Sequence, residues 1–386
     1  MKKSLLIASA AILAAGSISA QRLQDGYVTW PASGQLATYV SAWNGGNGTI
    51  QIDGVDFDDH NFFISRVKPR TRIQNTDTQI RPELIPTVIK DNGEVTTGTD
   101  KRLIYWVPIS NEIKGSQRLN ALADGMVDGE MFSMWSYIDV WGDWNAPFGW
   151  TPGNFADVCH RNGVSVHGVA SVPFGVLSSE WSSNLSAITA LDADAVGKFL
   201  YYHGQDGLGY NSEWSESSGT VTGKLVTMHH GLKEYMKDRN PLWEVMWYGG
   251  TWENGSKTFD VGVTENNYPT LFKSSSVFLN YGWNDLADIE KSITFAEGIS
   301  RDPFYIYAGM NMQGGEPRSG QNYDMLKDYA HSIGLWGAHS TNMLWNDRFN
   351  NGGSDLAKQQ TYQKAIEQWF GNGPRNPAVQ LTPTLN

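Results

Sequence analysis

The chain has 386 residues, of which 40% are hydrophobic and 18% are charged, and its formal net charge is −11. This composition indicates a globular protein rather than a disordered one. The acidic balance and the absence of any run of Lys and Arg argue against nucleic acid or an anionic membrane surface as a partner.

The first 20 residues have the pattern of a secretory signal peptide. Lys2 and Lys3 form a basic start, residues 5–15 are apolar, and small residues precede Gln21. The apolar stretch is too short to span a membrane, and the sequence contains no other transmembrane candidate. We therefore expect an exported protein, located in the periplasm, at the cell surface or outside the cell.

The remaining sequence divides into three parts. Residues 21–100 contain short apolar runs among many Gly, Asn, Asp and Thr residues, which predicts an irregular, β-rich segment that packs on the main domain. Residues 101–370 alternate between β-rich runs and amphipathic stretches. Residues 371–386 contain three prolines and indicate a tail or linker.

Eight strands and six helices are predicted within residues 101–370. The strands are expected at residues 103–109, 131–141, 164–172, 206–213, 243–248, 277–283, 304–310 and 335–344. The helices are expected at residues 154–162, 187–202, 221–237, 285–297, 323–333 and 356–370. This alternation predicts an α/β protein of the (β/α)8 TIM-barrel type, with an open doubly wound sheet as the competing architecture.

Polar residues and tryptophans gather where the predicted strands end. Active sites of (β/α)8 barrels lie at the carboxyl ends of the strands, so these residues are expected on one rim. The chain has 16 Trp residues, and flat aromatic rings suit the C–H faces of sugars. The polar residues expected there are Asp139, Asp143, Asn211, Glu213, Asn280, Asn284, Asn311, Gln313, Asn346 and Asp347.

The fourth predicted strand carries the chemistry. Asn211 and Glu213 are two residues apart, so in a strand they point the same way. Glycosidic cleavage usually needs two carboxyl groups, but here the partner of Glu213 is an amide. An amide can orient a 2-acetamido group whose own carbonyl oxygen attacks the anomeric carbon, with Glu213 as acid and then base. Asp206, on the opposite strand face, is interpreted as structural.

Residues 201–213 (YYHGQDGLGYNSE) resemble the DG-x-x-x-N-x-E region of the endo-β-N-acetylglucosaminidases of glycoside hydrolase family 85. Residues 156–168 are similar to the AHRHGV-type segment of this family, and Trp247-Tyr248 to the start of its WYDS segment. Residues 278–283 (FLNYGW) look like its F-x-NY-x-W strand, and residues 305–312 look like its seventh strand.

The resemblance implies a hydrolase that cuts the GlcNAc-β1,4-GlcNAc core of N-glycans by substrate-assisted, retaining catalysis. Asn211 would orient the acetamide, and Glu213 would be the acid and base. No cofactor or metal is expected, and the partner is an N-glycan or glycoprotein. The residues expected to bind substrate are Trp214, Tyr248, Trp252, Asn280, Tyr281, Trp283, Trp141, Asn311 and Trp345.

The sequence departs from the family at positions expected to contact the glycan. Gly249 and Gly250 replace the Asp-Ser of WYDS, and residues 259–264 keep little of the WQN-x-LN pattern. Two other hypotheses therefore stay open. One is a catalytically weak glycan-binding protein on the same barrel, and the other is a two-carboxylate glycosidase in which Asp139 or Asp143 is the nucleophile.

Overall fold

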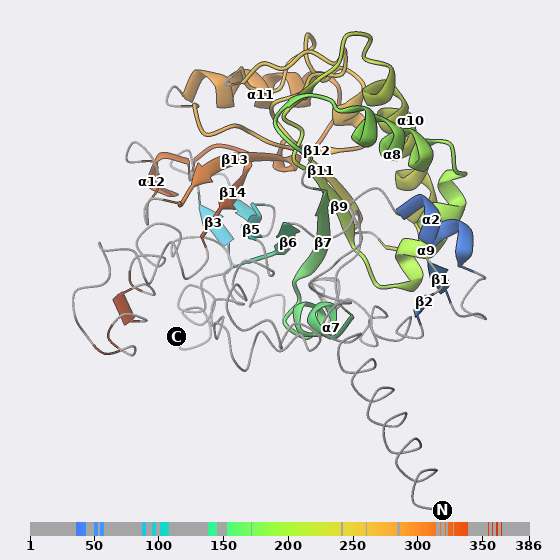
Figure 1. Ribbon diagram of the computed structural model, residues 1–386. Helices are drawn as coiled ribbons and strands as arrows, with labels where there is room; N and C mark the ends of the chain where they lie inside the picture. Colours follow the sequence, from blue (N-terminus) through green and yellow to red (C-terminus); the bar gives the residue numbers. More distant parts are fainter. Residues whose placement is uncertain are drawn as a thin grey trace, which may run out of the picture.

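Eight parallel strands close into a barrel (Figure 1). The computed structural model describes residues 36–43, 50–52, 55–57, 87–89, 95–97, 101–107, 138–144, 153–170, 172–240, 242–259, 261–283, 286–313, 317, 321, 323–326, 328–338, 354, 357, 360, 361 and 364. The barrel strands are β5 (Leu103–Val107), β6 (Val140–Trp144), β7 (Ser165–Ala170), β9 (Gly207–Tyr210), β11 (Glu244–Tyr248), β12 (Ser276–Phe278), β13 (Ile306–Asn311) and β14 (Ser332–Trp336).

The strands follow one another around the barrel in chain order, and β14 closes the ring by pairing with β5. The predicted (β/α)8 barrel is therefore confirmed, together with the order of its eight strands. An open doubly wound sheet is excluded, because such a sheet leaves two unpaired edge strands.

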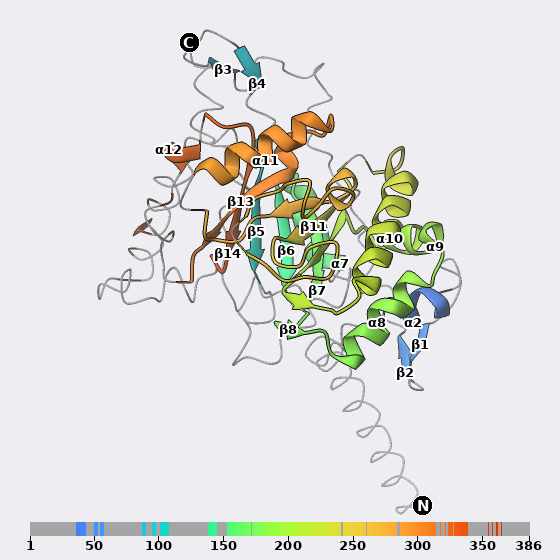
Figure 2. The ribbon, with the colours of Figure 1, turned by 90° about the horizontal axis from the view of Figure 1, so that it is seen from above.

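Helices cover the outside of the barrel. They are α7 (Gly153–Arg161), α8 (Ser179–Thr189), α9 (Ala193–Tyr202), α10 (Thr220–Met236), α11 (Leu286–Gly298) and the short α12 (Tyr323–Leu326), with single 3-10 turns η2 (Leu271–Lys273) and η3 (Pro303–Tyr305). Helix α10 packs against both α8 and α9 along one flank of the barrel (Figure 2). In the part of the chain that the structure describes, no helix is both long and apolar enough to cross a membrane.

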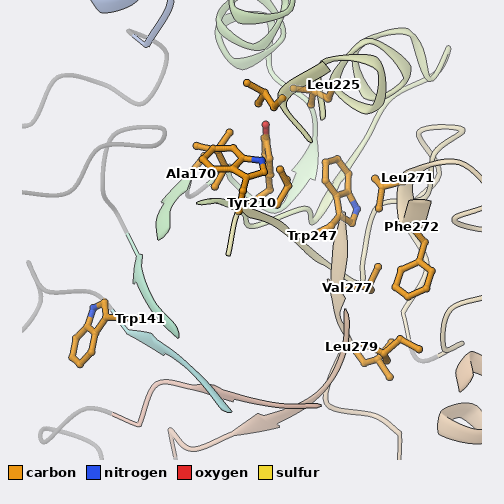
Figure 3. Close-up of a cluster of buried hydrophobic side chains, with 14 of the residues drawn as sticks. Trp141, Ala170, Tyr210, Leu225, Trp247, Leu271, Phe272, Val277 and Leu279 are labelled. Atoms are coloured by element: carbon orange, nitrogen blue, oxygen red, sulfur yellow. The ribbon is translucent and has the colours of Figure 1, made fainter. Parts of the chain in front are cut away.

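Successive side chains of each strand alternate between two apolar layers. Met246 and Tyr248 of β11 point into the barrel, where they pack with Trp106 and Phe278. Trp247, between them in sequence, points outward and belongs to the larger layer beneath the helices. Figure 3 shows this outer layer, with Trp141, Tyr210, Trp247 and Val277 on the outer side of the strands. The alternation follows from the two-residue period of a strand.

Glycines on three of the barrel strands make room for the large rings inside the barrel. A Cβ atom at Gly142 would overlap the Trp106 indole, and one at Gly334 would overlap the Phe278 ring. Gly209 of β9 lies against Val169 and Trp106 in the same way. Side chains therefore fill the barrel interior, and the site must lie at one of its ends.

Smaller elements fall within the predicted β-rich segment at residues 21–100. They are α2 (Leu36–Ala42), the antiparallel pair β1 (Ile50–Ile52) and β2 (Val55–Phe57), and the antiparallel pair β3 (Thr87–Ile89) and β4 (Val95–Thr97). Trp43, directly after α2, packs edge-on against Phe199 of α9 at 5.6 Å and lies 5.1 Å from the Tyr202 ring. The predicted signal peptide, residues 1–20, and the predicted tail, residues 371–386, lie outside the described residues.

Several predicted element boundaries are wrong. The fourth strand ends at Tyr210 rather than at 213, and the sixth ends at Phe278 rather than at 283. The helix predicted at residues 187–202 is two helices, because the Asp192 carboxylate accepts the backbone N–H of Asp194 and starts α9 anew. The second strand, β6, runs three residues beyond the predicted end at 141. The eighth strand, β14, begins three residues before the predicted start at 335, within a predicted helix, because β13 and β5 pair with it on both sides. The last predicted helix, residues 356–370, lies mostly outside the described residues.

Candidate active site

Strand β9 delivers Asn211 and Glu213 to the carboxyl-terminal rim of the barrel. The strand ends at Tyr210, and the Asn211 backbone N–H extends its ladder by donating to the Ala170 carbonyl at 2.9 Å. The chain then bends, since the Glu213 N–H donates to the Asn211 carbonyl at 2.9 Å. The two side chains nevertheless meet, as the sequence predicts, because Asn211 Nδ2 donates to Glu213 Oε2 at 2.9 Å.

Both amide hydrogens of Asn211 are used by the protein. The second donates to the Val172 carbonyl at 3.0 Å, and the side chain is buried. Among the described residues, its Oδ1 accepts no hydrogen bond, since both side-chain bonds of Asn211 are made by Nδ2. The amide group is therefore held in one orientation, with its oxygen available to accept an N–H group from a ligand.

The Glu213 carboxyl group has a raised pKa. Partial burial raises it, and the hydrogen bond from Asn211 and the positive charge of Lys257 offset part of that increase. A carboxyl group that stays protonated toward neutral pH can donate a proton to a leaving oxygen, so Glu213 fits the role of a general acid.

Two tyrosines and an amide lie beside Glu213 on the rim. Tyr248 ends β11, and Tyr281 follows β12, with their ring centroids 5.7 Å apart. Asn280 Nδ2 donates to the Tyr248 hydroxyl at 2.7 Å. Burial raises the pKa of Tyr281 well above its ordinary value, and Tyr248 and Glu213 add to the increase. The structure therefore brings three of the predicted substrate-binding residues together next to the predicted catalytic pair.

Three of the predicted tryptophans are in the core instead. Trp214 is fully buried, stacks edge-on against Trp247 and donates its Nε1–H to Thr222 Oγ1 at 3.3 Å. Trp283 is also buried and donates to the Gly309 carbonyl at 2.7 Å. Trp141 faces outward from β6, as Figure 3 shows, and its ring packs against Tyr105 at 5.1 Å between centroids. The prediction that these rings bind sugar is wrong, since protein atoms cover them.

The other predicted substrate-binding residues are not part of the group beside Asn211 and Glu213. Trp252 is half-buried and packs against the outer apolar layer. Asn311 ends β13 on the rim, and its Oδ1 accepts the Gln313 N–H at 2.9 Å. Trp345 lies outside the described residues, as do Asn284, Asn346 and Asp347.

Neither aspartate proposed as a second carboxylate reaches Glu213. Asp139 precedes β6, and its Oδ2 accepts the Leu103 N–H at 2.7 Å, which places it at the amino-terminal end of the barrel. Asp143 is buried, and it lies near Cys159 on α7, whose pKa is raised by burial and further by Asp206 and Asp143, so it faces the helix layer. The prediction that both lie on the catalytic rim is wrong.

Glu216, the remaining acidic residue near the pair in sequence, caps a helix. Its two oxygens accept the backbone N–H groups of Val221 at 3.0 Å and Thr222 at 2.7 Å, at the start of α10. Those N–H groups have no partner within the helix, so Glu216 satisfies them and is held in place. Among the described residues, no group of three or more His, Cys, Asp or Glu side chains is placed to hold a metal ion.

Sequence reasoning missed Phe174 and Lys257 near Glu213, and it named Phe259 only within the segment 259–264 that was expected to contact the glycan. Phe259 packs against Tyr248 at 6.4 Å between ring centroids, and a Cβ atom at Gly250 would lie 2.7 Å from the Phe259 ring. The glycine that departs from the WYDS pattern therefore makes room for this ring. Phe174 lies next to Phe259, and Lys257 lies over the Phe174 ring. The sequence pattern does not mark these three residues as part of the site, because they lie in irregular segments rather than at strand ends.

The fold and the rim define a (β/α)8 barrel with an amide–carboxyl pair at the end of its fourth strand. The sequence profile of glycosyl hydrolase family 85 matches residues 118–382. The chain belongs to this family, which confirms the resemblance found in the sequence motifs.

Two relatives illustrate the match. The cytosolic endo-beta-N-acetylglucosaminidase of Danio rerio is 24% identical over 226 residues, which cover 53% of this chain and 30% of that protein. The crystal structure of the Endo-D glycoside hydrolase domain from Streptococcus pneumoniae R6 matches with a TM-score of 0.59 and 18% identity, covering 87% of this chain and 52% of that chain. The chain thus spans about half of the Endo-D chain and less than a third of the zebrafish protein.

Proposed function

We propose that this protein is an endo-β-N-acetylglucosaminidase that hydrolyses the GlcNAc-β1,4-GlcNAc core of N-glycans. Membership of family 85 supports this proposal, as does the name of the zebrafish relative. The observation that carries it is the 2.9 Å hydrogen bond between Asn211 Nδ2 and Glu213 Oε2 on the rim. No second carboxylate among the described residues faces Glu213, so a substrate that supplies its own nucleophile fits this site.

The first step breaks the glycosidic bond. The carbonyl oxygen of the 2-acetamido group attacks the anomeric carbon, and Asn211 Oδ1 accepts the acetamide N–H and so holds the group in line. Glu213 donates its proton to the leaving oxygen, and its raised pKa keeps that proton available. The products of this step are the released sugar or glycoprotein and a glycan oxazolinium ion, which keeps the acetamide N–H proton.

The second step hydrolyses the oxazolinium ion. Glu213, now a carboxylate, removes a proton from water, and the water oxygen attacks the anomeric carbon on the face that the leaving group vacated. The bond between the acetamide oxygen and the anomeric carbon breaks. Two inversions give net retention of configuration, which makes the proposed mechanism a retaining one.

The same site motivates a second candidate, a glycan-binding protein with little catalytic activity. Gly249 and Gly250 replace side chains that the family pattern places next to Tyr248, and fewer polar contacts to the substrate would remain. Export is proposed separately, from the signal-like pattern of residues 1–20.

One incubation separates the two candidates. The protein is mixed with a glycoprotein that carries high-mannose, hybrid or complex N-glycans, and the glycoprotein is then weighed by mass spectrometry. An endo-β-N-acetylglucosaminidase leaves a single N-acetylglucosamine at each site, and the Glu213→Gln variant leaves the glycan intact. Binding without any loss of mass would establish the glycan-binding protein instead. Equal activity of the Glu213→Gln variant would remove Glu213 from the mechanism.

A further inference from the structure

A short two-stranded ribbon connects an exposed ring to the catalytic carboxyl group. Strand β8 (Gly175–Val176) pairs in parallel with β10 (Trp214–Ser215), with Gly175 opposite Trp214. The Gly175 N–H donates to the Glu213 carbonyl at 3.1 Å. Phe174 precedes Gly175 as Glu213 precedes Trp214, so the register places Phe174 level with Glu213. In Figure 2, β8 lies near β7, and the chain continues from β8 to α8.

Phe174 is one of the most exposed large apolar residues of the described chain. Its relative exposure is 65%, although a buried ring would be favoured by the hydrophobic effect. A single exposed apolar side chain is ordinary on a protein surface. What distinguishes Phe174 is that the β8–β10 hydrogen bonds hold its backbone at a set distance from Glu213.

Other side chains hold the Phe174 ring in place. The Lys257 ammonium lies 3.4 Å from the ring centroid, a cation–π contact. The Phe259 ring is nearly parallel to it, at an interplanar angle of 7° and a centroid distance of 6.5 Å. Phe259 in turn contacts Tyr248 at 6.4 Å. An aromatic row therefore runs from the exposed rim to the tyrosines beside Glu213.

The row extends outward from the site described above. Asn211 is buried at the inner end, so a sugar whose acetamide contacts Asn211 lies inside the rim. Glu213 protonates the oxygen on the far side of that sugar. Phe174 is the exposed ring at the level of Glu213, and a pyranose joined through this oxygen would lie over it with its C–H face.

We propose that Phe174 is the stacking platform for the N-acetylglucosamine on the leaving-group side of the scissile bond. It is a binding and specificity residue rather than a catalytic one. This inference rests on the proposed function, because the leaving-group side is defined by the roles of Asn211 and Glu213. Lys257 is the positioning residue beneath it, since its ammonium orients the Phe174 ring.

Two substrates test the platform. A glycan linked through the chitobiose core to asparagine has a sugar on the leaving-group side, whereas the preformed glycan oxazoline has none. Replacing Phe174 by Ala should raise KM for the first substrate about tenfold, the usual size of a lost aromatic contact. Hydrolysis of the oxazoline should stay within about twofold, because no stacked sugar is involved. Phe174→Trp should restore binding.

A matched control comes from the same ribbon. Val176 is 84% exposed and lies two residues beyond Phe174, on the same side of the strand but without a ring. Val176→Ala should leave KM for both substrates unchanged. An unchanged KM in Phe174→Ala, or an equal loss on both substrates, would overturn the proposal.

A binding experiment separates this proposal from the proposed function. N-acetylglucosaminyl-asparagine, the leaving group itself, is titrated into the wild-type protein and into Phe174→Ala and is followed by NMR. Loss of binding only in Phe174→Ala supports the platform, even if the wild type cleaves no glycan and the proposed function fails. Equal binding by both proteins overturns the platform, even if glycan cleavage is observed.

Discussion

The two ends of strand β9 carry acidic residues with opposite surroundings. Asp206, before the strand, accepts the Val166 N–H at 2.9 Å and Asn240 Nδ2 at 3.0 Å, and it lies 2.8 Å from His160 Nε2. Glu213, after the strand, accepts one side-chain hydrogen bond, from Asn211, among the described residues. The carboxylate oxygens of Asp206 are thus hydrogen-bonded within the protein, whereas those of Glu213 can still accept hydrogen bonds from a ligand.

The same contrast holds around the barrel. At the amino-terminal end, Glu244 Oε2 accepts Arg102 Nη1 at 2.8 Å and the Tyr307 hydroxyl at 3.1 Å. The Arg102 guanidinium also donates to the Phe304 carbonyl at 3.2 Å. In a (β/α)8 barrel the amino-terminal end serves stability and the carboxyl-terminal end serves chemistry. The difference lies in the partners: Glu244 is paired with the buried Arg102 guanidinium, whereas Glu213 accepts one hydrogen from an uncharged amide.

Glu213→Gln is expected to have the largest effect on activity. It removes the proton donor without changing shape, so hydrolysis of an N-glycan should fall about a thousandfold. Burial raises the pKa of Glu213, which means that the folded state disfavours the charged carboxylate, and Gln carries no charge. The melting temperature at pH 7 should therefore equal or exceed that of the wild type. Calorimetry measures the melting temperature, and a glycan-release assay measures the loss of hydrolysis. A clear loss of stability would contradict the contrast between Glu213 and the carboxylates at the amino-terminal end.

Glu244→Gln is the same substitution at the opposite end. It leaves the Arg102 charge without a partner carboxylate in a buried setting, so the free energy of unfolding should fall by about 3–5 kcal/mol. Once corrected for the folded fraction, kcat on an N-glycan should be close to that of the wild type. Urea unfolding and kinetics on the same preparation measure both quantities. A stable but inactive variant would show that the amino-terminal end takes part in the chemistry.

Asn211→Ala should act on the first chemical step. Without the amide, the acetamide loses its orientation, and hydrolysis of an intact N-glycan should fall about a hundredfold. Hydrolysis of a preformed oxazoline should fall much less, since its acetamide oxygen is already bonded to the anomeric carbon. Steady-state kinetics on both substrates decide this, and an equal loss on the two would argue against substrate assistance.

Acid should weaken the fold through its buried histidines. Burial, with a smaller contribution from His230, lowers the pKa of His229 to about 3, and its ring contacts Tyr210 and Ser275. The unfolded chain binds this proton near the ordinary histidine pKa, but the folded chain does not. Stability therefore falls as the pH decreases from about 6.5 toward 3, by up to about 1.4 kcal/mol per pH unit for this group.

The measurement is urea unfolding between pH 7 and pH 5 for the wild type and for His229→Gln. The variant should show a shallower loss of stability toward acid, because Gln does not titrate. His230→Gln is the matched control, since His230 is only half-buried and should change the slope less. Identical slopes for the wild type and His229→Gln would contradict the argument.

Local sequence patterns predicted the eight strands, their order and the position of Asn211 and Glu213 after the fourth. Apolar runs and turn residues are short-range features, and the parallel strand order follows from their alternation with helices. The pairing of Asn211 with Glu213 was also predictable, because it depends on a spacing of two residues. The backbone turns between Asn211 and Glu213 instead of continuing as a strand. The two side chains still form a hydrogen bond.

Only the tertiary structure decided which way the aromatic residues face. A shift of one residue in a strand moves a side chain to the other face, and boundaries predicted from sequence are uncertain by more than that. Trp141, Trp214 and Trp283 consequently lie in the core, while Phe174 reaches the rim through a ribbon formed by distant segments. Residue types and spacing were enough to locate the reactive pair, but its surroundings depend on contacts between elements far apart in the chain.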